Sequence, residues 1–186
     1  MSEQLKIVML VGTVRADRLT GRAAKFVRAQ MEAQFPDVEL MVHDVRDFHF
    51  PMDDDGTDIG HLNPQYQKDM AAADALLIVT PEYNHSFPGT LKRALDCLFD
   101  EYRHKAVGVV GVSNGMFGGV RVAEALLAVV RTLALVSIKP DHYFPRVQDT
   151  LTEDGVALDP ILAVSFGKFM TELTWMAGVL REGRKA

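Results

Sequence analysis

The sequence predicts an α/β protein: a three-layer sandwich in which helices cover both faces of a five-stranded parallel sheet with strand order 2-1-3-4-5. The first observation is a set of short continuous apolar runs, at residues 5–11, 38–43, 74–80, 106–112 and 134–138. Such runs are typical of strands that are buried on both faces. The second observation is that segments with helical spacing separate these runs, which favours parallel strands joined by helices. Right-handed crossovers leave few strand orders, and of these we expect 2-1-3-4-5.

The helices are predicted where apolar residues recur at intervals of three and four. They cover residues 20–35, 64–73, 88–102, 119–133 and 160–182. In the first helix, Ala23, Phe26, Val27 and Met31 form the apolar face. Two long loops, 44–63 and 139–159, complete the chain, and loops of this length are often functional.

Composition limits the classes of protein to consider. The chain has 186 residues, 48% hydrophobic and 24% charged, which predicts one globular domain over residues 1–186. A net charge of -5 with scattered basic residues argues against a nucleic-acid partner. The single cysteine suits a reducing cytoplasm. We see neither a signal peptide nor an apolar run long enough for a membrane span.

The first candidate binding segment, residues 12–21, joins the first strand to the first helix. Free N–H groups and the helix dipole favour an anion at such a junction. Thr13 and Thr20 offer hydroxyls and Arg15 offers a charged donor, so a phosphate monoester is the natural guest. Asp17 argues against an anion unless its carboxylate faces solvent, and an ordinary capped helix start is the alternative. The segment matches neither a dinucleotide-binding nor a P-loop motif.

Two further polar segments follow the third and fourth strands. Residues 80–89 place Pro81, Glu82, Tyr83 and Asn84 side by side, which suits contact with the edge of a flat heterocycle. Residues 113–119 are rich in glycine, so their backbone can approach a ligand closely. A strand-to-helix connection and a flexible loop are the respective alternatives. In the expected strand order all three segments meet at one sheet edge, where ligands of open α/β sheets bind.

These segments resemble those of the NADPH-dependent FMN reductase family, the flavodoxin-like group that includes chromate, quinone and azo-dye reductases. The resemblance rests on Gly12-Thr-Val-Arg15, Thr80-Pro-Glu-Tyr-Asn84 with Ser86 and Pro88-Gly89, and Ser113-Asn-Gly-Met-Phe-Gly-Gly119. It implies a flavodoxin-like fold that binds FMN: the phosphate at Thr13 and Arg15, and the ring at Pro81, Glu82, Tyr83, Asn84, Ser113 and Gly115.

The chain departs from the family pattern inside the phosphate segment. Arg18 stands where family members often have Ser, and Thr20 where they often have Asn. Arg18 either supplies a second positive charge to the phosphate or points away from it. We therefore include Arg18 and Thr20 among the expected cofactor-binding residues and leave the tightness of FMN binding open.

The expected function is an FMN-dependent NAD(P)H oxidoreductase that passes hydride from NADPH or NADH, through FMN, to a quinone-, azo- or metal-type acceptor. No catalytic side chain is expected, because the cofactor carries the chemistry, and no metal site is expected. The alternatives are a flavin reductase that uses FMN as a diffusible substrate and a non-catalytic electron-carrier module. The resemblance also implies a homodimer or homotetramer, and Leu95, Leu98, Phe99 and Tyr102 are its candidate face.

Overall fold

The computed structural model describes residues 4–51 and 59–185. Six strands occur in these ranges: β1 (Leu5–Val11), β2 (Val38–Asp44), β3 (Ala75–Pro81), β4 (Ala106–Val112), β5 (Val136–Ser137) and β6 (His142–Phe144). The α-helices are α1 (Thr20–Gln34), α2 (Pro64–Ala72), α3 (Gly89–Asp96), α4 (Val120–Thr132), α5 (Val147–Thr150) and α6 (Ile161–Lys185). Short 3-10 turns are η1 (Val45–Asp47), η2 (Gly60–Leu62) and η3 (Asp100–Tyr102).

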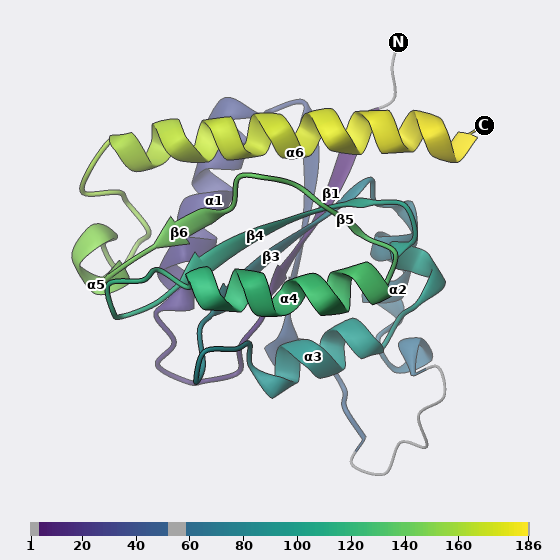
Figure 1. Ribbon diagram of the computed structural model, residues 1–186, viewed down its shortest axis with the longest axis horizontal. Coiled ribbons are helices and arrows are strands. Elements are labelled where there is room, and N and C mark those ends of the chain that lie inside the picture. Colours follow the sequence, from purple (N-terminus) through teal and green to yellow (C-terminus); the bar gives the residue numbers. More distant parts are fainter. Residues whose placement is uncertain (1–3, 52–58, 186) are drawn as a thin grey trace.

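The sheet has the predicted order β2-β1-β3-β4-β5, and all of these pairs are parallel. Helices α1 and α6 cover one face, and α2, α3 and α4 cover the other (Figure 1). Each face has its own apolar core, around Phe26 and Phe169 on the first and around Leu91 and Leu126 on the second. The three-layer fold predicted from the sequence is confirmed.

The sheet gains a strand that the sequence analysis assigned to a loop. Within the predicted loop 139–159, β6 pairs in parallel with Val110–Val112 at the carboxyl end of β4. Strand β5, predicted over 134–138, pairs only with Ala106 and Val107 at the amino end of β4. Two short strands therefore share one long neighbour. Strand β6 has only three residues, His-Tyr-Phe, and is too short to stand out in the sequence.

The predicted helix 88–102 is also shorter than expected, and its proposed face is wrong. Helix α3 ends at Asp96, and the chain turns so that the hydroxyls of Tyr102 and Tyr66 lie 2.8 Å apart in the core. Leu95, Leu98 and Tyr102 are buried within the chain, at 0%, 3% and 0% exposure. Only Phe99, which is 60% exposed, remains available to a partner from that predicted face.

Glycines let the segment after β4 fold back onto the sheet. A Cβ atom on Gly111 would lie 2.8 Å from the carbonyl oxygen of Gly118. Gly119, directly before α4, has φ of +91°, a conformation that glycine adopts without strain. The two positions together bring residues 113–119 over the carboxyl end of β4.

Candidate functional site

A cavity of about 350 Å³ opens at the carboxyl ends of β1, β3 and β4. Its walls come from the three segments predicted from the sequence, together with the start of α5; they are Arg15, Asp17, Arg18, Leu19, Thr20, Pro81, Glu82, Tyr83, Val112, Ser113, Asn114 and Val147. The strand order reverses between β1 and β3, so the cavity lies where ligands of open α/β sheets bind. Its volume is in the range of small-molecule sites.

The segment after β1 presents an uncapped helix start to this cavity. No side-chain hydrogen bond caps α1, and its first turn carries no acidic residue. Thr20 is buried at 1% exposure at the first position of the helix. The N–H groups of Gly21 and Arg22 donate to the carbonyls of Arg18 and Leu19, at 3.4 and 3.0 Å, so the positive end of the helix dipole is the main attraction that this helix start offers an anion.

Thr13 connects this segment to the turn after β3. Its hydroxyl lies 2.9 Å from the Tyr83 hydroxyl, and Thr13 is only 1% exposed. The Arg15 guanidinium sits over the Tyr83 ring, 5.0 Å from its centroid. Arg15 and Tyr83 also line a second, more open cavity of about 780 Å³, so they form a wall between two adjoining spaces.

Arg15 and Arg18, both in the segment after β1, differ in their interaction partners. Arg18 forms a bidentate ion pair with Asp44 and also donates to the carbonyl of Thr13. Burial raises the pKa of Asp44, but hydrogen bonds from Arg18 and from the Arg46 N–H outweigh it, so this pKa lies below its ordinary value. Arg15 has no ion-pair partner among residues 4–51 and 59–185, and its charge is the more accessible of the two.

Two residues that support the first segment escaped the sequence analysis. Besides the Asp44 contact with Arg18, Arg46 donates to the carbonyls of Arg15 and Ala16. The two arginines, Arg18 and Arg46, thus bind the backbone carbonyls of Thr13, Arg15 and Ala16 in the segment after β1. The sequence held a signal for them, because Asp44 ends β2 and Arg46 follows it at the same sheet edge, but both were assigned to the long loop 44–63.

The turn after β3 is a tight hairpin. Tyr83 and Ser86 exchange two backbone hydrogen bonds of 2.8 and 2.9 Å. The residues between them, Asn84 and His85, have φ of 51° and 66°, as in a type I′ turn. Asn84 is exposed and does not line the cavity; its position supports a turn-forming role.

Glu82 links this turn to the segment after β4. Its side chain is 9% exposed, and one carboxylate oxygen accepts a 2.8 Å hydrogen bond from Arg121 on α4. The Arg121 guanidinium in turn lies 4.4 Å from the centroid of the Phe117 ring. The other oxygen, Oε2, is buried without a hydrogen-bond partner in the described part of the chain. Glu82 thus lines the cavity, but its Oε2 atom is closed off from it.

Ser113 organises the third segment. Its hydroxyl donates to the carbonyl of Gly115 at 2.8 Å and accepts from the N–H of Gly118 at 3.0 Å. The Ser113 N–H donates to the carbonyl of Phe144 on β6, and the Ser113 carbonyl accepts from the N–H of Val147 on α5. Gly115 is exposed and does not line the cavity.

The structure therefore brings most of the predicted site residues together. Seven line the cavity: Arg15, Arg18, Thr20, Pro81, Glu82, Tyr83 and Ser113. Thr13 adjoins it through Tyr83, whereas Asn84 and Gly115 shape the backbone of their segments. Arg121 and Val147 belong to the site and were missed, because only folding brings them to the sheet edge.

Within residues 4–51 and 59–185, no group of His, Cys, Asp and Glu side chains is placed to hold a metal ion. Over the same ranges, no helix combines the length and the apolar content that crossing a membrane requires.

The fold and the strand order define a flavodoxin-like α/β protein with a cavity at the carboxyl edge of its sheet. The family model of the NADPH-dependent FMN reductases matches residues 5–148. The chain belongs to this family.

Relatives agree with that assignment. The chain is 32% identical over 174 residues to a quinone reductase of Escherichia coli K12, covering 86% of this chain and 88% of the relative. It is 28% identical over 157 residues to a 2-hydroxy-1,4-benzoquinone reductase of a Burkholderia species, covering 81% and 84%. Among solved structures, FerB of Paracoccus denitrificans, an NAD(P)H:(acceptor) oxidoreductase, has a similar fold, with a TM-score of 0.76, 22% identity and coverage of 96% and 98%.

Proposed function

We propose that this protein is an FMN-dependent NAD(P)H oxidoreductase that reduces a small acceptor of the quinone, azo or metal type. The observation that carries the proposal is that Arg15, Arg18 and Thr20 line the same cavity as Pro81, Glu82, Tyr83 and Ser113. The family and the quinone reductase relatives supply the chemistry that such a cavity would serve.

The donor set fits the phosphate of FMN. The N-terminus of α1 offers the positive end of the helix dipole, Thr13 and Thr20 offer hydroxyls, and Arg15 offers an accessible positive charge. A phosphate monoester at a helix N-terminus is a common arrangement. Asp17 lines the same cavity and opposes the anion, but the accessible charge of Arg15 offsets it.

The other end fits a flat ring with polar edges. Pro81, Tyr83 and Ser113 line this part of the cavity. Glu82 also lines the cavity, and Arg121 holds its carboxylate in place. We assign ring binding to Pro81, Glu82, Tyr83 and Ser113, with Asn84 and Gly115 shaping the backbone around it.

When bound, FMN supplies the electron-accepting and electron-donating chemistry. The protein's own residues bind and orient. Thr13 fixes Tyr83 by a hydrogen bond, Arg121 fixes Glu82, and the type I′ hairpin keeps both walls rigid. The adjoining cavity beyond Arg15 and Tyr83 is open enough for a nicotinamide or an acceptor.

The test is the visible spectrum of the purified protein, followed by anaerobic addition of NADPH and of NADH. We expect flavin bands that bleach with a nicotinamide and return when a quinone is added. A protein that binds no FMN, and that oxidises no nicotinamide when free FMN is supplied, would contradict the proposal.

A second candidate, a reductase that uses FMN as a diffusible substrate, has one observation in its favour. Arg18 is committed to Asp44, so it contributes less charge to the phosphate seat than its position suggests. This variant predicts a colourless purified protein that oxidises NADPH only with added FMN. An electron-carrier module would instead hold FMN and show no turnover with a nicotinamide.

We further propose a homodimer or homotetramer located in the cytoplasm. Phe99 is exposed beside an apolar groove between α3 and α4, with Leu98, Val129 and Leu133 in its walls. A second copy of the chain would cover this groove. Sedimentation of wild type and of Phe99→Asp tests it, because the variant should lose this contact.

A further inference from the structure

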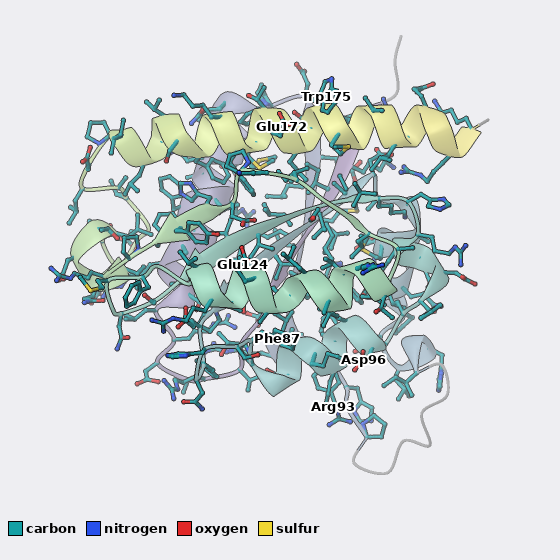
Figure 2. All side chains as sticks on the ribbon, viewed as in Figure 1. Phe87, Arg93, Asp96, Glu124, Glu172 and Trp175 are labelled. Atoms are coloured by element: carbon teal, nitrogen blue, oxygen red, sulfur yellow. The ribbon has the colours of Figure 1, made fainter. Side chains whose placement is uncertain are left out.

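The outer side of α6 carries a second apolar surface, separate from the candidate site and from the α3–α4 groove. Four of its side chains are exposed although they are apolar: Ile161 at 58%, Val164 at 54%, Trp175 at 58% and Val179 at 50%. Figure 2 shows Trp175 on the side of α6 that faces away from the sheet. The helix buries its opposite side through Phe166, Phe169, Met170, Leu173 and Ala177.

These exposed residues form one stripe. At 100° per residue, Ile161, Val164 and Val179 lie within about 40° of Trp175 around the helix axis. Lys168 falls in the same stripe, about 20° from Trp175, and Glu172 lies at its border, about 60° away. The stripe therefore has an apolar group toward each end, with a basic and an acidic residue near its middle.

This order of residues is self-complementary when the helix is reversed. If a second α6 runs antiparallel with its two-fold axis near Met170, Ile161 meets Val179 and Lys168 meets Glu172. Val164 then falls beside Trp175. An isologous contact requires such pairing, because each residue of one copy must meet its counterpart on the other.

We propose that the outer face of α6, defined by Ile161, Val164, Lys168, Trp175 and Val179, is a self-association surface that binds the antiparallel α6 of a second copy. The charges support this occupant. Neither Lys168 nor Glu172 has an ion-pair or hydrogen-bond partner in residues 4–51 and 59–185. Across the two-fold axis each finds one of opposite charge, twice per dimer.

The dimensions agree with a helix-pair contact. From Ile161 to Val179 the stripe extends over roughly 27 Å of helix. Helix α6 runs along one edge of the molecule, with its outer side uncovered in Figure 1. Because α6 and the α3–α4 groove lie in opposite outer layers, both surfaces can be occupied at once.

Charge reversal is the first test, read by sedimentation equilibrium of the full chain. Lys168→Glu sets two glutamates against each other at both symmetric contacts, and Glu172→Lys does the same with lysines. We expect each single variant to raise the dissociation constant of the contact at least ~10-fold. The double variant Lys168→Glu/Glu172→Lys restores opposite charges and should return to the wild-type value.

Trp175 is the second readout, since it is the only tryptophan in the sequence. Its emission should shift to shorter wavelength as the wild-type concentration rises, because association buries the ring. Val164→Glu should abolish that shift. Leu127→Glu, the same kind of change at a 44% exposed residue of α4, is the matched control and should leave the shift unchanged.

Three results would overturn the proposal. They are a wild-type chain whose Trp175 emission is independent of concentration, single charge reversals that leave the dissociation constant unchanged, and a double variant as weak as the single ones. The last result would mean that the stripe contacts something other than an antiparallel α6. Nicotinamide oxidation measured on the same variants separates this outcome from a failure of the proposed function.

Discussion

His142 on β6 should make the stability of this protein depend on pH. It is buried at 4% exposure in a box of aromatic rings, with Phe26, Phe144, Phe166 and Phe169 at centroid distances of 4.8 to 6.2 Å. Its Nε2 atom has no hydrogen-bond partner in the described part of the chain. A charged imidazole would be poorly solvated there, so burial lowers the pKa of His142 from 6.5 to about 4.

The direction of this pH dependence follows from proton binding to His142 in the folded and the unfolded chain. Between pH 6.5 and about 4 the unfolded chain binds a proton at His142 and the folded chain does not. The free energy of unfolding therefore falls as the pH is lowered through this window, and it is fully recovered above pH 6.5. At 1.36 kcal/mol per pKa unit, the contribution of His142 amounts to about 3 kcal/mol.

Urea unfolding at several pH values between 4 and 7 measures this effect. His142→Phe should remove most of the fall, because phenylalanine suits an aromatic box and carries no proton. His104→Phe, at an exposed position, is the matched control and should leave the wild-type dependence intact. A pH dependence that is the same in His142→Phe and wild type would refute the reasoning.

Three further predictions concern the site and the backbone around it. Arg15→Ala should raise the dissociation constant of FMN about 10- to 100-fold, because it removes a charged hydrogen bond. Asp44→Asn frees Arg18 and should lower the same constant roughly fivefold. Equilibrium dialysis against FMN measures both, and a change in the same direction for both variants would contradict the roles given to the two arginines. Gly111→Ala should lower the free energy of unfolding by about 1–3 kcal/mol, because its Cβ would overlap a carbonyl oxygen of the segment after β4. Urea unfolding measures this change. Gly21→Ala, which has open space around the new Cβ, is the control. Steady-state rates with NADPH and a quinone should give parallel double-reciprocal lines, since both substrates must use the same open space, and intersecting lines would count against a shared space.

Much of this protein could be inferred from its sequence, because the signals are local. Continuous apolar runs marked the first four strands, and helical spacing marked the helices between them. Placing polar segments after the first, third and fourth strands was enough to bring Arg15, Tyr83 and Ser113 to one cavity, since parallel strands end at the same edge.

Only the tertiary structure decided which side chains are free to act. Arg18 and Arg15 look equivalent in the sequence, but Asp44, 26 residues from Arg18, holds one of them and leaves the other. Helix α3 stops at Asp96 because burying Tyr102 beside Tyr66 outweighs the local helical pattern. Ion pairs and core contacts join residues distant in the chain, and no local spacing records them.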